Sequence, residues 1–442
     1  MEKDMSTKPE QSFFDRFLHS QTVGSVILIF ATATALMWAN SDWAELYYAI
    51  SHLEIGVHLA GKTYQMHLEH WVKDGLMAIF FFVVGLEVKR EVVVGELSSV
   101  RQAVLPVMAA VGGCTIPALL YFLFNRTGDA ASGWGVPMAT DIAFALGILA
   151  LFGRRVPIGL KIFLTALAIV DDLIAVIVIA VFYTEQINIG SMIWAAGFLA
   201  LFFTAVKFQT RRPALYLVPA IGVWVCVMLS GIHATIAGVI IALLIPVKST
   251  IEPKHFFDTI CMHMQGLKTA DPLTRESLVS NNRQRKSVEQ IYLTAEDMIP
   301  TGIALEKHFH PVQAFIILPL FALFSAGVTF NTATMASFPG PVSLGIICGL
   351  VFGKQIGILF FSWIAVESGQ TEMPEEVRWP HIWGVSLLAG IGFTMSIFIS
   401  ELGFSSQAMI DEAKIGIFTA SLLAGIGGYL VLNRTLPSPG TA

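Results

Sequence analysis

The sequence predicts an all-α polytopic membrane protein with twelve transmembrane helices. Of its 442 residues, 55% are hydrophobic and only 13% are charged, and the mean hydropathy is +0.69. A soluble fold of this length cannot bury so much apolar surface. Apolar stretches of about 17 to 25 residues are long enough to cross a bilayer. Twelve such stretches lie near 22–40, 70–88, 102–124, 133–153, 158–183, 189–206, 213–230, 233–247, 311–330, 340–366, 381–401 and 411–433.

These stretches divide the chain into regions, and the positions of the basic residues predict on which side of the membrane each region lies. Lys and Arg gather in the short connections on one side, for example at Arg101, Arg154 and Arg212. The positive-inside rule puts that side, and both termini, in the cytoplasm. The expected regions are a cytoplasmic N-terminal segment 1–21, helices one to eight in 22–247, a long cytoplasmic loop 248–310, helices nine to twelve in 311–433, and a cytoplasmic tail 434–442.

A small extracytoplasmic β-hairpin is predicted between the first two spans, near 54–68. Apolar and polar residues alternate on both sides of Ala60-Gly61-Lys62, which is typical of two strands joined by a glycine-containing turn. An isolated hairpin is marginally stable in water. Pairing with the hairpin of a second copy would complete it, so we expect a homodimer contact here. Packing of the hairpin on its own protomer is the alternative.

Two adjacent aspartates, Asp171 and Asp172, interrupt the fifth span. An ionised carboxylate in hydrocarbon costs roughly 2.5 to 3.5 kcal/mol even on a lenient scale. The pair is therefore predicted to face a watery cavity that binds cations or protons. Adjacent residues on a helix point about 100° apart, so we expect Asp171 and Asp172 to have different roles. The alternative is that one pairs with a buried base and the other reaches an interface.

Two spans contain residues that favour a broken helix. Pro137 and the pair Thr140-Asp141 lie near the middle of the fourth span, where Pro removes a backbone donor and Thr or Asp can satisfy the freed groups. Gly390, Gly392 and Thr394 lie at the middle of the eleventh, although glycines also line close helix crossings. Two interrupted helices in two halves of a chain are expected of transporters with inverted-topology repeats, where they cross at mid-membrane.

Lys354 is a further charged group inside an apolar span. It lies too far from either end of the tenth span for its amino group to reach an interface. It should therefore meet an acid or a water-filled cavity, and Asp171 or Asp172 is the natural partner. The sequence leaves open whether the lysine is a fixed structural cation or exchanges a proton.

Other classes of function receive little support. The chain contains no HExxH, GxSxG, P-loop or dinucleotide motif, so we expect no enzyme and no cofactor. No basic tract interleaved with aromatic residues suggests nucleic acid. An intramembrane aspartyl protease would need its aspartates on separate helices, typically with a GxGD segment. A passive cation channel and a sodium-coupled solute symporter remain as alternatives to a transporter that exchanges cations for protons.

Seven segments resemble the NhaA family of bacterial sodium/proton antiporters. In order across almost the whole chain, they are FFFVVGLEVKRE, ATDIAFALGILALFG, FLTALAIVDDLIAV, SGIHATIAG, ILPLFALFSAG, FGKQIGI and GIGFTMSIFI. The resemblance implies a twelve-helix inner-membrane protein in the lipid bilayer. It would extrude Na+ or Li+ in exchange for external protons, electrogenically and under pH control. The inverted repeats are a property of this family, so that expectation is partly inherited from the resemblance.

The resemblance also implies roles for particular residues. Asp172 and Asp171 would be the ligands of the transported Na+, with Asp172 as the main one, and would exchange protons. Thr140, Asp141 and Lys354 would belong to the helix crossing and its charge compensation. The candidates for the pH response are Glu87, Arg90, Glu91, His233, Glu306 and Lys307.

Alternatives exist for the pH-response candidates. Charged residues such as Glu87 and Arg90 can simply anchor helix ends at the interface, and His233 can be a core histidine. Lys307 stands where the family commonly has a histidine, so we expect a pH threshold shifted in a direction that the sequence leaves open. If the second and ninth spans are neighbours, as the resemblance implies, a charged cluster should form at the cytoplasmic mouth from Glu87, Arg90, Glu91, Glu306, Lys307 and His308.

Overall fold

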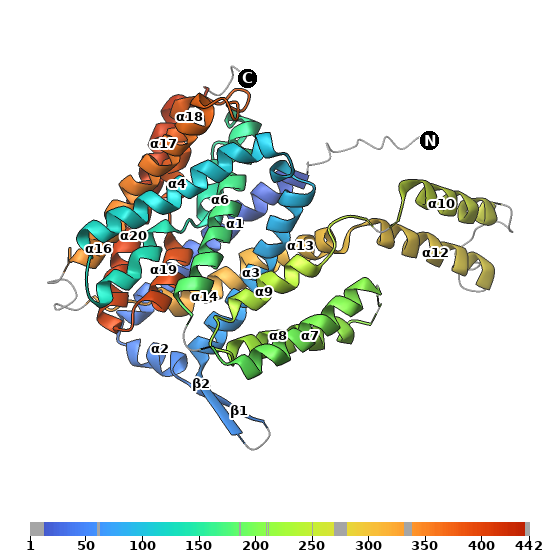
Figure 1. Ribbon diagram of the computed structural model, residues 1–442, viewed down its shortest axis with the longest axis horizontal. Coiled ribbons are helices and arrows are strands. Elements are labelled where there is room, and N and C mark those ends of the chain that lie inside the picture. Colours follow the sequence, from blue (N-terminus) through green and yellow to red (C-terminus); the bar gives the residue numbers. More distant parts are fainter. Residues whose placement is uncertain are drawn as a thin grey trace.

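The described part of the chain is mostly helical in a computed structural model (Figure 1), which describes residues 13–59, 62–184, 187–208, 210, 212–249, 251–268, 281–330 and 338–437. In the first part of the chain the elements are α1 (Phe13–Ala39), α2 (Ala44–Ser51), β1 (Glu54–Leu59), β2 (Lys62–His67), α3 (Leu68–Val93), η1 (Glu96–Ser98), α4 (Val100–Phe124), η2 (Asp129–Met138), α5 (Ile142–Ala150), η3 (Gly153–Arg155), α6 (Ile158–Phe182), α7 (Ile189–Lys207), α8 (Ala214–Met228) and α9 (Thr235–Leu244).

The remaining elements include two π-helical turns, η4 and η5. They are α10 (Pro253–Lys268), α12 (Asn282–Met298), α13 (Thr301–Val312), η4 (Gln313–Ile317), α14 (Leu318–Ser325), α16 (Pro341–Cys348), η5 (Gly349–Gly353), α17 (Lys354–Glu367), α18 (Trp379–Ala389), α19 (Phe393–Gly403) and α20 (Gln407–Thr435).

Every apolar stretch predicted from the sequence contains a helix. By length and hydropathy, seven helical segments of the described chain are long and apolar enough to cross a membrane, or up to nine if each bent pair counts as one span. The structure is thus that of a multi-pass helical membrane protein. Helices α8 and α9 are shorter apolar helices, and the short helix α2 was not anticipated.

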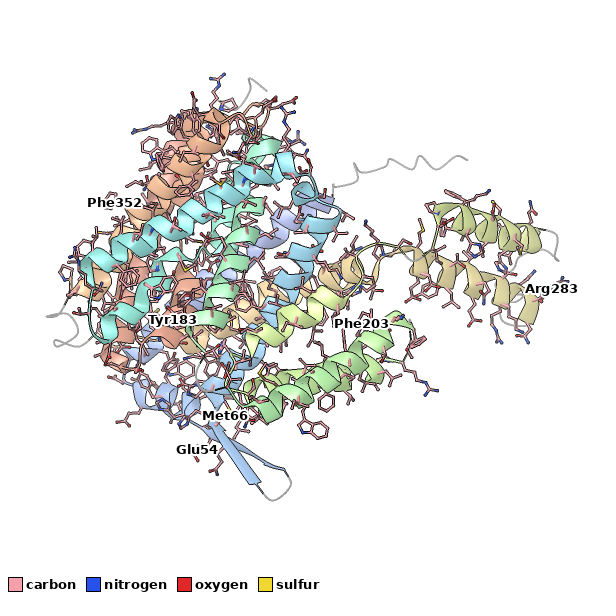
Figure 2. All side chains as sticks on the ribbon, viewed as in Figure 1. Glu54, Met66, Tyr183, Phe203, Arg283 and Phe352 are labelled. Atoms are coloured by element: carbon pink, nitrogen blue, oxygen red, sulfur yellow. The ribbon has the colours of Figure 1, made fainter. Side chains whose placement is uncertain are left out.

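Large apolar side chains on the outside of the molecule fit a lipid environment. Phe203 on α7 and Phe352 in η5 are 48% and 56% exposed, and both lie at the surface of the bundle (Figure 2). In a soluble protein such side chains would face water; in a bilayer they face hydrocarbon of their own polarity.

Both predicted helix breaks are present. The 3-10 segment η2 ends at Met138 and α5 begins at Ile142, so Thr140 and Asp141 lie in the gap. In the eleventh predicted span, α18 and α19 meet at an angle of 47°. Its break spans residues 390–392, where the sequence contains the two glycines.

The predicted hairpin is an antiparallel pair of strands that projects from one end of the bundle (Figure 1). Leu59 pairs with Lys62 beside the turn, whose residues 60 and 61 lie outside the described part. Helix α3 begins at Leu68, directly after β2. The hairpin therefore marks the end of the molecule at which α3 starts.

The long connection 248–310 contains helices of its own. Helices α10 and α12 pack against each other and project from the bundle (Figure 1). Much of the polar stretch between them, residues 269–280, lies outside the described part. Helix α13 begins at Thr301, inside the range expected as loop, so the ninth helix is longer than its apolar core.

Close packing of α4 on α17 positions the site described below. These two helices make one of the most extensive contacts in the bundle. The backbones can approach because both contribute glycine: a Cβ on Gly357 would lie 2.0 Å from the Gly112 carbonyl oxygen. The approach brings the N-terminal end of α17 toward α6, which also packs on α4.

Candidate ion-exchange site

The two broken helices are joined by hydrogen bonds between their gaps. The Thr140 hydroxyl donates to the carbonyl of Ala389 at 2.8 Å, and the Asp141 N–H donates to the carbonyl of Ile391 at 2.7 Å. Each unwound segment thus supplies partners to the other, which compensates backbone groups that have lost their helical partners.

Asp141 caps both half-helices that begin at the crossing. Its Oδ1 accepts from the Phe144 N–H of α5 at 3.1 Å. Its Oδ2 accepts from the Thr394 N–H of α19 at 3.1 Å and from the Thr394 hydroxyl. A carboxylate at two positive helix ends offsets their partial charges. Thr394 was not among the predicted site residues, although its place directly after the break was visible in the sequence.

Asp171 forms a buried ion pair with Lys354. The Nζ of Lys354 lies 2.9 Å from Oδ1 and 2.7 Å from Oδ2, and neither side chain is exposed. The Cys114 thiol of α4 donates to Oδ1 at 2.9 Å. Of the two partners that the sequence left open for Lys354, the structure selects Asp171. The thiol was not predicted, because a cysteine in an apolar span looks like any small core residue.

Asp172 is buried in a different way. Only 1% of the residue is exposed, yet neither carboxylate oxygen has a hydrogen-bond partner among the described residues. A buried ionised carboxylate without a partner is strongly unfavourable, so this group needs a proton, a cation or water. The adjacent aspartates thus have different surroundings, as the 100° rotation between them led us to expect.

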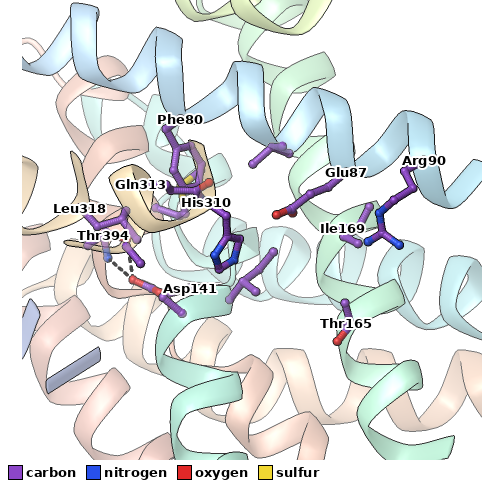
Figure 3. Close-up of a pocket in the computed structure, with 15 residues that line it drawn as sticks. Phe80, Glu87, Arg90, Asp141, Thr165, Ile169, His310, Gln313, Leu318 and Thr394 are labelled. Carbon is purple, nitrogen blue, oxygen red and sulfur yellow. Dashed lines mark hydrogen bonds between the residues drawn. The ribbon is translucent and has the colours of Figure 1, made fainter. Parts of the chain in front are cut away.

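A cavity reaches the crossing and is lined by Glu87 and Arg90 (Figure 3), which lie toward the end of α3 away from the hairpin. It leaves about 40 Å³ for the centres of water molecules, enough for more than one. Polar groups from five elements and from the gap before α5 line it: Glu87, Arg90, Asp141, Thr165, His310, Gln313 and Thr394. Thr165 and Ile169 line it from α6. They share a helix face with Asp172 because the spacings are four and three residues.

Arg90 gathers acidic side chains at the outer part of this cavity. Its Nε lies 3.1 and 3.0 Å from the two carboxylate oxygens of Glu306, and its Nη1 lies 2.8 Å from Glu91 Oε1. Glu87, one turn earlier on α3 than Glu91, lines the cavity beside Arg90 (Figure 3). The acidic candidates of α3 and α13 are therefore brought together.

The expected contribution of Lys307 and His308 to that cluster differs from the observed one. Both side chains are exposed, and the His308 ring bonds back to the Ala304 carbonyl at 2.7 Å. His310 lines the cavity instead. It lies four residues after Glu306 and hence on the same helix face, a periodicity that could have identified it.

His233 lies apart from this cluster. Its ring packs on Phe398 with 5.3 Å between centroids, and its Nε2 has no hydrogen-bond partner among the described residues. It is half-buried in the turn before α9. Its surroundings are those of a packed aromatic side chain.

The sequence as a whole was then compared with known proteins. A family model described as Na+/H+ antiporter 1 matches residues 15–432. The chain belongs to this family of Na+/H+ antiporters. It is similar to the Na(+)/H(+) antiporter NhaA of Koribacter versatilis, with 42% identity over 422 residues, 95% of this chain and 91% of the relative. The antiporter NhaA 1 of Saccharophagus degradans is 44% identical over 426 residues, with coverage of 95% and 91%. NhaA of Acidithiobacillus ferrooxidans is 43% identical over 422 residues, with coverage of 95% and 96%.

Membership of the Na+/H+ antiporter 1 family decides between the classes of function. The chain is a multi-pass membrane protein for Na+/H+ antiport, and it is not an enzyme. The antiporter prediction is confirmed over the solute symporter and the intramembrane protease. A protease would also need facing aspartates from two helices, whereas Asp171 and Asp172 are neighbours on α6.

We predict a strong energetic coupling between Asp171 and Lys354. Removing either charge leaves the other buried and unpaired, which typically costs about 3 to 5 kcal/mol. Asp171→Asn and Lys354→Ala should each lower the midpoint of thermal unfolding, and the double variant should lose much less than the sum. Asp171→Asn combined with Lys207→Ala, an exposed lysine on α7, should be additive. Additive losses for the first pair would show that the two groups do not act together.

Proposed function

We propose that the chain extrudes Na+ or Li+ from a bacterial cell across the inner membrane, in exchange for external protons that enter, and that the ion binds at Asp172 with help from Asp171. The observation that carries this proposal is the buried Asp172 carboxylate, unpartnered among the described residues beside the neutralised Asp171–Lys354 pair. A cation at Asp172 would supply the missing charge compensation.

The chemistry of sodium supports this assignment. Na+ is a hard cation that takes several oxygen ligands, which carboxylates, backbone carbonyls and water can supply. Within the described residues no group of three or more His, Cys, Asp and Glu side chains could hold a metal ion. The other ligands of a bound Na+ would thus be water and carbonyl oxygens, as expected for an ion that must leave again.

Exchange follows from competition for the same oxygens. A protonated carboxyl group loses its charge and most of its affinity for Na+, so protons and Na+ exclude each other at Asp172. When Na+ arrives, Asp171 turns from Lys354 toward the ion, and Lys354 becomes free to release a proton. Two or more protons released for each Na+ bound make the cycle electrogenic. Asp141 remains on Thr394 and Phe144 and compensates the helix ends without touching the ion.

The proposed architecture has twelve spans, with the two broken helices as equivalent members of two inverted-topology repeats. Supporting it are one break in each half of the chain and the contact between them. Rocking of one bundle of helices against the other would then expose the site to either side in turn. We place both termini in the cytoplasm on the positive-inside rule. A C-terminal reporter that is active only outside the cell would contradict this orientation.

We also propose a homodimer held by the β-hairpin. The hairpin projects from the bundle (Figure 1), and the sheet in the described chain has only the strands β1 and β2, so both outer edges can accept a strand. Deleting residues 54–67 and joining the ends with a short glycine-serine linker should convert the detergent-solubilised dimer to a monomer. Measurement of the mass by light scattering tests this. A dimer that persists would place the contact elsewhere.

Replacing Asp172 by Asn should abolish Na+-evoked proton movement while the protein stays folded. The amide keeps the shape of the carboxyl group but can neither carry a charge nor exchange a proton. The assay uses liposomes with a pH dye inside and a Na+ pulse outside, and a potassium ionophore distinguishes electrogenic from electroneutral exchange. Asp129→Asn, at an exposed aspartate in η2, is the matched control and should exchange normally. Near-normal exchange by folded Asp172→Asn would overturn the site.

The pH response is proposed to depend on Arg90 and its acidic partners, not on Lys307. Glu306 is largely buried against Arg90, where charges interact strongly, whereas the exposed Lys307 is screened by water. Glu306→Gln should shift the pH of half-maximal exchange by about one unit, equivalent to about 1.4 kcal/mol. Lys307→His should shift it much less. The reverse order, or no shift for Glu306→Gln, would locate the sensor elsewhere.

A further inference from the structure

Three charged side chains meet at the end of the molecule that carries the β-hairpin. Oε1 of Glu401 lies 2.9 Å from Nζ of Lys73 and 3.0 Å from Nζ of Lys414. The side chains of Glu401, Lys73 and Lys414 are 14%, 14% and 5% exposed. Glu69, one turn before Lys73 on α3, is more distant at 3.9 Å. One carboxylate oxygen thus holds two largely buried ammonium groups.

Each member of this cluster depends on Glu401. The carboxylate lies in the last turn of α19, where the negative end of the helix disfavours an acidic group. The two lysines bind the same oxygen and would repel each other without it. The positions of Lys73 and Lys414 are therefore coupled through the single charge of Glu401. Each lysine has two states, one in which its amino group is bound to the Glu401 carboxylate and one in which it is not.

The two ion pairs differ in what they connect. Lys73 belongs to α3, which packs most extensively on α9 and also contacts α13 and α14. Glu401 and Lys414 belong to α19 and α20, which pack on each other, while α20 also packs on α18 and α16. The Lys73–Glu401 pair therefore connects two groups of helices: a first group of α3, α9, α13 and α14, and a second group of α16, α18, α19 and α20. The Lys414–Glu401 pair lies within the second group.

Deeper in the bundle the same two groups meet through apolar rings. Phe398 of α19 packs on Phe81 of α3 with 5.9 Å between centroids and on Phe321 of α14 with 6.2 Å. Apolar surfaces can slide past each other without leaving a charge unpaired. The Lys73–Glu401 pair, in contrast, must break if α19 moves away from α3.

The described cavity lies on the other side of the helix crossing. It is lined from α3 by Glu87 and Arg90, and Glu87 follows Lys73 by fourteen residues, or about 21 Å along the helix. In this conformation the crossing is therefore reached from the end away from the hairpin, while the hairpin end carries the bridging ion pair.

We propose that the Lys73–Glu401 pair is a latch that keeps the ion site closed toward the hairpin side and that opens once in each transport cycle. The latch rests on the alternating-access cycle proposed above. Lys414 stays on Glu401 when Lys73 leaves and keeps the carboxylate neutralised. Glu401 and Lys73 thereby set the balance between the two states without touching the transported ion.

The test measures the KM for Na+ separately on each side, in sealed vesicles in which the antiporter has one orientation. The apparent affinity on one side scales with the population open to that side. The ratio of KM on the hairpin side to KM on the opposite side therefore follows the ratio of the two populations. Lys73→Met should lower this ratio by about fivefold or more, in the range typical of conformational coupling. Damage to the ion site itself would change both KM values and leave the ratio unaltered.

Lys414→Met is the matched control, because it removes a lysine from the same oxygen but leaves the bridging pair intact. It should hold the ratio at or above that of the unsubstituted protein, because Glu401 then has no cation left once Lys73 leaves. Lys73→Arg should retain the ratio, and Glu401→Gln should lower it, which gives a second variant if Lys73→Met fails to fold.

An unchanged ratio in folded, exchanging Lys73→Met or Glu401→Gln would overturn the latch alone. An equal decrease of the ratio in Lys414→Met would also overturn it. If Na+ drives proton exchange from only one side of the unsubstituted protein, the alternating-access cycle fails and the latch with it.

Discussion

Asp171 and Asp172 lie side by side in the middle of an apolar helix, and much of the surrounding architecture follows from the need to compensate them. Asp171 requires a buried cation, which Lys354 supplies from the first turn of α17. The lysine reaches it because α17 packs tightly on α4, an approach that only glycine permits at positions 112 and 357. Packing of α6 on α4 brings the Cys114 thiol to the same carboxylate. Asp172 receives no such partner within the described chain, and this difference between neighbours is the basis of the ion site proposed at Asp172.

The broken helices solve a second problem created by polar groups at mid-depth. Each gap exposes backbone groups that cannot be left unpaired in a water-poor interior. The gaps satisfy each other through Thr140 and Asp141, and Asp141 in turn holds the first turn of α19 through Thr394. Because the crossing is held by hydrogen bonds between two particular segments, α5 and α19 are positioned relative to each other and to the end of the cavity. Displacing α19 therefore changes the surroundings of the crossing directly.

The sequence identified the charged residues of the site more readily than their partners. Asp171, Asp172, Asp141 and Lys354 were evident because a charge within an apolar span is costly and rare. Whether Lys354 pairs with Asp171 or with Asp172 depends on how α6 is rotated against α4 and α17. That rotation is set by tertiary packing and not by the local sequence. Cys114 and His310 were missed because each is an ordinary residue in its own segment and acquires a role only through tertiary contacts. Thr394 was expected at the second break, but its bonds to Asp141 were not. Lys307 was expected in the cluster of Glu306, but the neighbouring position on a helix points to a different face. The hairpin and both breaks were predictable because turn glycines and a mid-span proline act locally.

Helix α3 forms an ion pair toward each end, Lys73 with Glu401 and Arg90 with Glu306. The two pairs differ in which helices they connect. Arg90 binds Glu306 of α13, and α13 packs on α3 itself, so this pair can respond to protonation without any large movement of helices. Lys73 binds Glu401 of α19, which belongs to the other group of helices and also holds Asp141 at its N-terminal end. In the proposed cycle, a change of charge at the cavity end of α3 alters the local field, whereas breaking the pair at the hairpin end accompanies a movement of one group of helices relative to the other. The proposed pH response and the proposed latch therefore lie toward opposite ends of one helix, and α19 connects the latch to Asp141 at the crossing.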